Sequence, residues 1–508
     1  MWDHGYTTSV DYLSSYHTEL NPLRVDLSLL YAGILPPKID FACELGFGQG
    51  MNINVSSSTS NIKWYGNDFN PTQANHANLL NSITNGDAHL SDKSFEEFCQ
   101  DETLPDFDFI ALHGIWTWIS DENRGIISDF IRRKLKVGGV LYISYNTSPG
   151  WAGMEHLRLL MLDYFYNANP KIAQTEEKIK KTLNFFDEVK NTEPLFFSKN
   201  PTLLERLNKF TELDTRYLAH ELFNKDWKPM SILELSEYLN ETKVSYVSSA
   251  YYLDAISVLN FSEEQAGLIN TIPSDIRREA FKDIMINQTF RRDFWVKGPI
   301  KLTENDKLNR FLEKWVVMVC NMNDINFKVS GVRGEADLQR EIYEPIVNQF
   351  CKKGPMKLKE AFSNLSRTHS LKQFCEAIIV LIGNKHFAPA NDPETSKKFE
   401  QKAGKINKYF LKKAYEGERY QNLCSPVTSS AISVHRVDQL FAQYLKENKN
   451  NYKNLAKIVF EILKSKGQTL LQEGKPIAND PDLLKELEVR AETFVTTSLP
   501  LYRLLKVL

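Results

Sequence analysis

Residues 41–58 read FACELGFGQGMNINVSSS, a short apolar run followed by glycines at positions 46, 48 and 50. An apolar run that ends in closely spaced glycines is typical of a β-strand that turns sharply into an α-helix. Glycine allows positive φ angles and lets the backbone approach another group closely. The stretch therefore predicts a binding loop at the end of a strand in an α/β fold.

The spacing of these glycines argues against two common phosphate-binding loops. A dinucleotide-binding loop has the pattern G-x-G-x-x-G, and Met51 stands where its third glycine belongs. A phosphate loop ends in lysine followed by serine or threonine, and Met51 and Asn52 occupy those places. The loop is instead E-x-G-x-G-x-G, which resembles the first motif of class I S-adenosylmethionine-dependent methyltransferases. In that family the loop lies along the amino-acid part of the cofactor.

The first third of the chain alternates short apolar runs with helical patterns. Strands are expected at 39–45, 62–69, 107–114 and 138–146, with helical stretches between them. Such an alternation predicts an open, doubly wound α/β sheet with crossover helices. The resemblance to class I methyltransferases implies the same Rossmann-like fold.

Changes in composition divide the rest of the chain. Residues 230–253 read as a helix followed by an alternating strand, which can complete the core sheet. Beyond a boundary near Gly298, the order helix, helix, strand resembles a winged helix. We therefore expect a methyltransferase core at 1–165, a helical insertion at 166–209, a regulatory-type region at 210–298, a winged-helix-like module at 299–395 and a helical region at 396–508.

Two aspartates extend the expected cofactor site. Asp68 ends the second strand, where a nucleoside-binding sheet needs an acceptor for ribose hydroxyls, although capping of the next helix by Asp68 or Asn70 competes with this role. Asp87 is expected after the third strand, where class I methyltransferases often carry an acid for the adenine amino group. The resemblance implies cofactor contacts from Glu44, Gly46, Phe47, Gly48, Gln49, Gly50, Asp68, Phe69, Gly86, Asp87, Ala88, His113 and Gly114.

Four longer stretches resemble one group of these enzymes. The stretches ALHGIWTWIS (111–120), YNTSPGW (145–151), YLAHELFNKDWKPMSILELSEYL…VSYVSSA (217–250) and NQTFRRDFWVKG (287–298) are similar to bacterial methyltransferases that carry a methyltransferase regulatory domain. This group includes the rickettsial protein lysine methyltransferases that modify outer-membrane protein B. The resemblance implies a methyltransferase core, helical segments and a C-terminal region that helps to hold a protein substrate.

A lysine acceptor makes specific demands on the site. The amine must be positioned in line with the sulfonium, lose its proton and face an electron-rich wall. His113 is the candidate proton acceptor. Asn146 is the candidate for orienting the amine, although the stretch YNTSPG around it is equally typical of a turn. The candidate aromatic walls, for which core packing is the alternative, are Trp116, Trp118, Tyr145, Trp151 and, from the N-terminal segment, Tyr12 and Tyr16.

Composition narrows the class of acceptor. Lys+Arg 62 and Asp+Glu 64 leave a net charge of -2 among 508 residues, and HGIW replaces the [D/N]-P-P-[F/Y] motif of nucleobase methyltransferases. Both features argue against a nucleic-acid substrate. The six cysteines form no C-x-x-C pair, so no metal site is expected. Because about 350 residues follow the core, more than a small acceptor requires, we expect a protein substrate.

Two other functions stay open on the sequence. One is methylation of small molecules or peptide natural products, and the other is a regulatory protein that keeps the cofactor fold without catalysis. A homodimer also stays open. No apolar run approaches the ~18 residues of a membrane span, and the N-terminus lacks the basic-then-apolar layout of a signal peptide. We therefore expect a cytoplasmic bacterial protein without membrane insertion.

Overall fold

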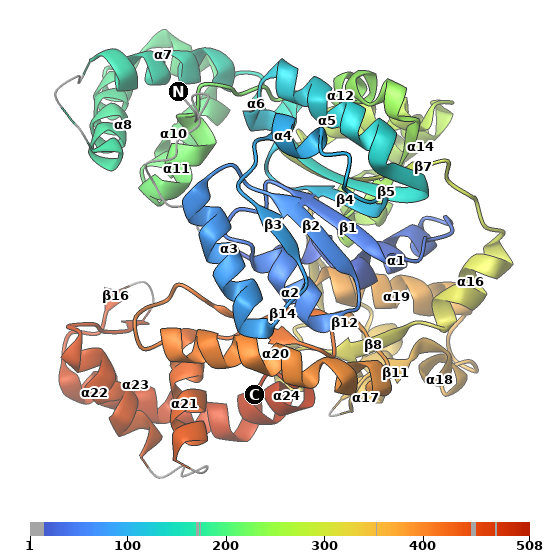
Figure 1. Ribbon diagram of the computed structural model, residues 1–508, viewed down its shortest axis with the longest axis vertical. Helices are drawn as coiled ribbons and strands as arrows, with labels where there is room; N and C mark the ends of the chain where they lie inside the picture. The colour runs from blue at the N-terminus through green and yellow to red at the C-terminus, as the bar shows by residue number, and fades with distance from the viewer. Residues whose placement is uncertain (1–14, 169–171, 173, 352, 449–453, 473–474) are drawn as a thin grey trace.

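A seven-stranded sheet forms the centre of the molecule. The computed structural model describes residues 15–168, 172, 174–351, 353–448, 454–472 and 475–508. The strand order is β3-β2-β1-β4-β5-β7-β6, in which β1 to β5 run parallel and β7 is antiparallel to both neighbours (Figure 1). This order confirms the predicted doubly wound α/β fold. The strands are β1 Phe41–Leu45, β2 Lys63–Asn67, β3 His89–Ser91, β4 Phe107–Leu112, β5 Leu135–Asn146, β6 Val244–Ser249 and β7 Phe290–Lys297.

Helices cover both faces of this sheet. One face packs against the first three helices, and the other packs against α4, α5 and α12. Strand β4 is buried along its whole length, as expected for a parallel strand with helices on both sides. The helices are α1 Pro22–Tyr31, α2 Met51–Thr59, α3 Pro71–Thr84, α4 Phe95–Cys99, α5 Asp121–Lys134 and α12 Ile232–Tyr238.

A helical insertion separates β5 from the last two strands of the sheet. Its helices share an apolar cluster of their own and form a group at the upper left of Figure 1. They are α6 Ser148–Trp151, α7 Met154–Asn167, α8 Thr175–Asn191, α9 Leu195–Lys199, α10 Pro201–Phe210 and α11 Thr215–Leu222. Three further helices lie between β6 and β7: α13 Ser257–Asn260, α14 Glu263–Thr271 and α15 Asp275–Met285.

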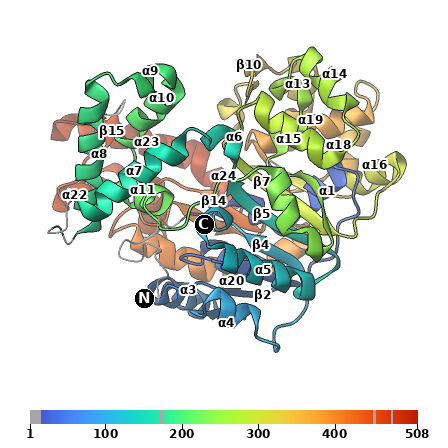
Figure 2. The same ribbon diagram turned by 90° about the horizontal axis from the view of Figure 1, so that it is seen from above.

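The next region is built on a small antiparallel sheet of order β11-β8-β12. Figure 2 shows its helices on the same side of the molecule as α13 to α15. The elements are α16 Glu304–Leu312, β8 Trp315–Met318, β9 Lys328–Gly331, β10 Gly334–Asp337, α17 Arg340–Phe350, β11 Met356–Lys357, α18 Leu358–Ser363, α19 Leu371–Gly383 and β12 Phe387–Ala390.

The C-terminal region is mainly helical and packs against the core. Helix α20 runs beside α2 and α3 (Figure 1), and Lys402 Nζ donates to the carbonyl of Ser57 over 2.8 Å. Helix α2, which begins at the glycine loop, is thus supported by a distant part of the chain. The elements are α20 Pro393–Lys413, β13 Asn422–Ser425, β14 Ser430–Ser433, α21 Arg436–Glu447, α22 Leu455–Ser465, β15 Leu471–Gln472, β16 Lys475–Pro476, α23 Asp480–Thr493, a π-helical turn Phe494–Ser498 and α24 Leu499–Leu504.

The segment before β3 differs from the sequence prediction. Asp87 was expected after the third strand, but the strand begins at His89, so this expectation is wrong. Asp87 therefore lies at the amino end of β3. No helix within the described ranges is long and apolar enough to cross a membrane.

Candidate cofactor and active site

The glycine loop leaves β1 at Leu45 and enters α2 at Met51. Gly46, Gly48 and Gly50 have φ angles of 68°, 58° and 74°, a region that other residues rarely adopt. A Cβ atom on Gly46 would stand 2.3 Å from the Ile115 side chain, and one on Gly50 would stand 2.4 Å from Ala77. Both backbone geometry and close packing therefore require glycine in this loop.

Two adjoining cavities lie over this loop at the carboxyl ends of β1, β2 and β4. One, of about 70 Å³, is lined by residues that include His17, Glu44 and His113. The other, of about 160 Å³, is lined by residues that include Phe69, Phe95 and Trp118. Both are lined by Gly46, Asp68, Gln73, Gly114 and Ile115, and the two cavities together are here called the edge cleft.

Two buried carboxyl groups dominate the electrostatics of the edge cleft. Glu44 is 5% exposed, and its Oε2 atom has no hydrogen-bond partner. Burial, with the nearby Asp68, raises the pKa of Glu44 to about 8. Asp68 accepts hydrogen bonds from the backbone N–H groups of Gly48 (2.8 Å) and Asn70 (3.1 Å), and burial raises its pKa to about 7. Among the described residues, no lysine or arginine pairs with either carboxyl, so a bound cation would supply the missing counter-charge.

His113 follows β4 and closes one end of the edge cleft. Its Nδ1 shares a 2.7 Å hydrogen bond with the Tyr142 hydroxyl, and its ring stacks on His17 with 3.6 Å between centroids. Burial, followed by the positive charge of His17 and Arg292, holds the pKa of His113 well below its usual value. His113 is therefore a neutral imidazole in this setting.

His17 is a site residue that the sequence analysis missed. Its backbone is fixed by two hydrogen bonds with the Asn52 side chain, of 3.0 and 2.7 Å. Its Nε2 lies 3.0 Å from the Ser15 hydroxyl, and burial lowers its pKa. The N-terminal segment thus crosses the first turn of α2 and puts a second imidazole into the edge cleft. No local motif marks this position, because the contact joins residues 35 apart.

The two tryptophans after β4 take different places. Trp116 is fully buried, and its Nε1 donates to Met230 Sδ over 3.2 Å, so it belongs to the core. Trp118 lines the edge cleft, and its Nε1 donates to the Glu221 carbonyl over 3.2 Å. The short 3-10 helix Trp116–Trp118 directs one ring inward and leaves the other at the cavity wall.

The other acceptor-site candidates do not line the edge cleft. The Asn146 amide donates to Glu221 Oε1 over 3.0 Å and is 3% exposed. Tyr16 packs against the apolar cluster of the C-terminal region. The Tyr145 hydroxyl donates to Asp293 over 3.0 Å, and Trp151 packs beneath the Arg206 guanidinium at 4.2 Å. Tyr12 lies outside the described residues.

The cofactor candidates around β3 also lie elsewhere. Asp87 is exposed and pairs with Lys402 over 3.2 Å. A Cβ atom on Gly86 would stand 2.1 Å from Asn81, so this glycine permits the end of α3, and Ala88 packs in the core. At the carboxyl end of β3, the residues that line the edge cleft are Ser94, Phe95 and Glu96.

Comparison with known sequences places the chain in a family. A model described as a predicted methyltransferase regulatory domain matches residues 214–297. The uncharacterized protein sll1526 of Synechocystis sp. is 32% identical over 507 residues, which cover 98% of each chain. The chain belongs to the family of sll1526 and carries a region that matches the methyltransferase regulatory domain. A further relative, the uncharacterized protein RP789 of Rickettsia prowazekii, is 25% identical over 61% of this chain and 56% of its own length.

A solved structure has the same fold over nearly the whole chain. PKMT2 from Rickettsia typhi, determined alone and in complex with AdoHcy, matches this chain with a TM-score of 0.68 at 18% identity, covering 98% of this chain and 99% of the other. The matched regulatory domain spans α11 to β7 and therefore supplies the last two strands of the central sheet. In this chain the matched region is thus part of the central sheet rather than a separate unit.

Proposed function

We propose that this chain binds S-adenosylmethionine in the edge cleft and transfers its methyl group to lysine side chains of a protein. The observation that carries the proposal is the pair of buried carboxyls, Glu44 and Asp68, beside three glycines with positive φ. Binding a ligand that carries an ammonium group and ribose hydroxyls would satisfy both carboxyls. S-adenosylmethionine supplies an electrophilic methyl group when bound.

Each part of the edge cleft has a proposed role in holding this cofactor. The glycine loop, with Phe47 and Gln49, lies along the methionine end, and the unpartnered Glu44 oxygen accepts from the ammonium group. Asp68 accepts from the ribose hydroxyls at the end of β2. Phe69 and Phe95, which line the larger cavity, flank the base.

The two stacked imidazoles are the proposed proton acceptors. A lysine ammonium must lose a proton before its nitrogen can attack, and a neutral imidazole can accept one. His113 and His17 both line the edge cleft, and burial lowers the pKa of each, which keeps both rings neutral while making them weaker bases than a free imidazole. The Tyr142 hydroxyl fixes the orientation of the His113 ring. Trp118, at the cavity wall, is the proposed aromatic contact for the acceptor.

A protein acceptor is supported by the surface of the helical insertion. Eight of its large apolar side chains are exposed by 38% or more: Leu159, Leu160, Tyr166, Phe185, Leu195, Phe196, Leu213 and Tyr217. We propose these side chains as contacts for a protein acceptor, because apolar surface that gathers into a patch is typical of protein-contacting sites.

The test is transfer of a labelled methyl group from S-adenosylmethionine into a bacterial lysate. We expect label on lysine side chains of proteins, and loss of most of it with the His113→Ala chain. Label confined to the small-molecule fraction would support a small acceptor instead. Cofactor binding without transfer to either fraction would indicate a noncatalytic regulatory protein.

A further inference from the structure

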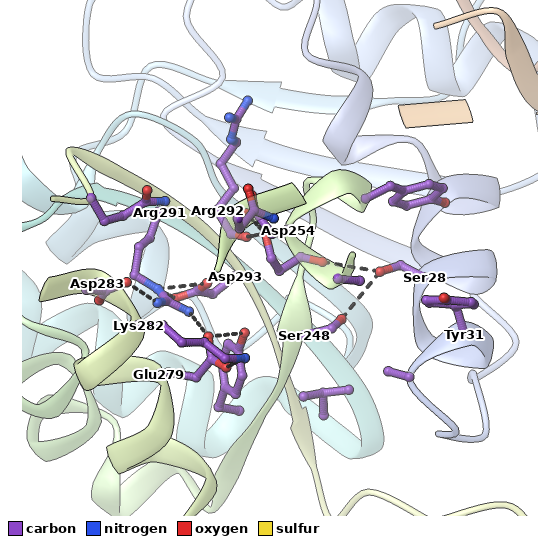
Figure 3. A pocket seen from close by; sticks show the side chains of 18 of the residues that line it. Ser28, Tyr31, Ser248, Asp254, Glu279, Lys282, Asp283, Arg291, Arg292 and Asp293 are labelled. Carbon is purple, nitrogen blue, oxygen red and sulfur yellow. Dashed lines mark hydrogen bonds and ion pairs between the residues drawn. The ribbon is translucent and has the colours of Figure 1, made fainter. Parts of the chain in front are cut away.

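A further cavity lies beside β7, between the regulatory domain and the helices α1 and α19. It has a volume of about 310 Å³ and is walled by β6, β7 and α15, by Ser28 and Tyr31 of α1, and by Ile379 of α19 (Figure 3). It shares no lining residue with the edge cleft. We call it the Arg291 cavity.

Three carboxyl groups accept hydrogen bonds from the Arg291 guanidinium. Arg291 is 5% exposed and donates to Asp283 (2.6 Å), Glu279 (2.9 Å) and both oxygens of Asp293 (3.1 and 2.9 Å). Figure 3 shows these three acids converging on Arg291 from α15 and β7. With its three nitrogens engaged in this way, Arg291 offers little to an incoming anion.

The cavity is nevertheless lined by more carboxyl groups than cationic side chains. The carboxyl groups are Asp254, Glu279, Asp283 and Asp293, and the cationic side chains are Lys282, Arg291 and Arg292. Lys282 pairs with Glu279 over 2.7 Å. Arg292 turns away from this group (Figure 3) and pairs with Glu19, which does not line the cavity, over 2.8 Å. Asp254 accepts from the Ser249 hydroxyl over 2.6 Å and forms no ion pair within the described ranges.

One of these carboxylates also has an unused acceptor. Asp283 is 2% exposed, its Oδ1 accepts from Arg291, and its Oδ2 has no hydrogen-bond partner. Buried polar atoms are nearly always satisfied, so an orphan atom in a cavity wall indicates a missing donor. An ammonium group supplies both a donor and the missing positive charge.

We infer that the Arg291 cavity binds an alkylammonium group at the unpartnered oxygen of Asp283, with Asp254 adding negative charge to the same cavity wall and the rings of Tyr31 and Tyr246 beside the alkyl chain. The inference does not depend on the proposed methyl transfer. The ammonium has two possible sources, a lysine side chain of a bound protein or a free alkylamine. Because the walls come from α1, the regulatory domain and α19, the ligand contacts three regions of the chain at once.

Calorimetric titration of the full chain tests this site with 1,5-diaminopentane, with an Nα-acetyl-lysine amide and with the neutral 1-pentanol. S-adenosylhomocysteine is kept saturating throughout, so that the edge cleft is filled. We expect both amines to bind and pentanol not to bind. Tighter binding of the lysine amide would indicate a protein source, and tighter binding of the diamine would indicate a free amine.

Variants locate the binding. Asp254→Asn and Asp283→Asn should each weaken amine binding by about tenfold or more, because each removes negative charge from the cavity wall. Asp129→Asn, an exposed change on α5, is the matched control and should leave binding unchanged. Thermal melts verify that each variant is folded. If Asp283→Asn does not fold, Asp254→Asn still tests the site. Absence of amine binding at millimolar concentrations, equal binding of pentanol, or unchanged binding in the folded variants would overturn the inference.

Discussion

The edge cleft and the Arg291 cavity both bury carboxyl groups, but they balance them differently. In the edge cleft, Glu44 and Asp68 have only backbone donors or no donor. In the Arg291 cavity, one guanidinium holds three carboxyls together. A buried charge without a partner opposes folding, whereas a paired one is costly mainly when its partner is removed. Glu44 and Asp68 in the edge cleft can therefore accept a cationic ligand. The ion pairs of Arg291 instead link β7 to α15.

The largest effect is expected from breaking the ion pairs of Arg291. Arg291→Met leaves the buried Asp283 and Asp293 without a cation and Glu279 with Lys282 alone, and it should lower the free energy of unfolding by about 3–5 kcal/mol. Denaturant unfolding followed by circular dichroism measures this loss. Arg292→Met is the matched control, because its single pair with Glu19 is partly exposed, and it should cost about 1 kcal/mol or less. Equal losses of unfolding free energy in Arg291→Met and Arg292→Met would show that the Arg291 ion pairs do not stabilise the contact between β7 and α15.

In the edge cleft, removal of an unpaired carboxyl should raise stability, whereas removal of Arg291 from its cluster should lower it. Glu44→Gln removes a buried carboxyl without a cation, so the cofactor-free chain should melt at a higher temperature than the wild type. The same variant should weaken S-adenosylhomocysteine binding by about 1.5–3 kcal/mol, since it loses a charged hydrogen bond to the ammonium group. Melting curves with and without ligand measure both quantities. A lower melting temperature without ligand would contradict the stated role of Glu44.

The pH dependence follows from the raised pKa values, which are about 8 for Glu44 and about 7 for Asp68. In the unfolded chain both groups ionise near their usual range, so rising pH favours unfolding of the cofactor-free protein until the folded pKa values are passed. Ligand binding needs the ionised forms and should strengthen by about tenfold per pH unit below pH 7 for each group that must ionise. Titrations at several pH values check this slope. A flat profile would mean that neither carboxyl meets the ligand.

A smaller effect is expected where the C-terminal region supports the glycine loop. His76 of α3 bridges the Gln49 carbonyl (2.9 Å) and the Tyr420 hydroxyl (2.6 Å). Tyr420→Phe should weaken S-adenosylhomocysteine binding by about 0.5–1.5 kcal/mol, because one neutral hydrogen bond is lost. Tyr415→Phe, which removes an exposed hydroxyl contact with Glu447, is the control. If both variants bind S-adenosylhomocysteine alike, the bridge from Tyr420 through His76 does not support the glycine loop.

The sequence predicted those parts of the site that depend on local chemistry. The glycine loop was found from its spacing, and Asp68 from its place at a strand end, because these features follow from the geometry of a single β-α unit. Asp87 was misplaced because β3 has only three residues and a weak apolar pattern. A short strand without clear alternation gives little local signal.

Features that depend on long-range packing were not predictable from the sequence. The contact of His17 with Asn52, the engagement of Asn146 by Glu221 and the support of Gln49 by His76 and Tyr420 each join separate elements. The inward ring of Trp116 and the cavity-facing ring of Trp118 also depend on how a 3-10 helix sits against the regulatory domain. The cytoplasmic location and the C-terminal module roles stay predictions.

The most direct test of this account is calorimetric titration of S-adenosylhomocysteine into the full chain near pH 7, in two buffers of different ionisation enthalpy. The account predicts one binding site per chain and a release of protons, because the bound ammonium and ribose favour the ionised forms of Glu44 and Asp68. Binding heats should therefore differ between the two buffers. Absence of binding at millimolar ligand, or binding with the same heat in both buffers, would contradict the claim that these carboxyls await the cofactor.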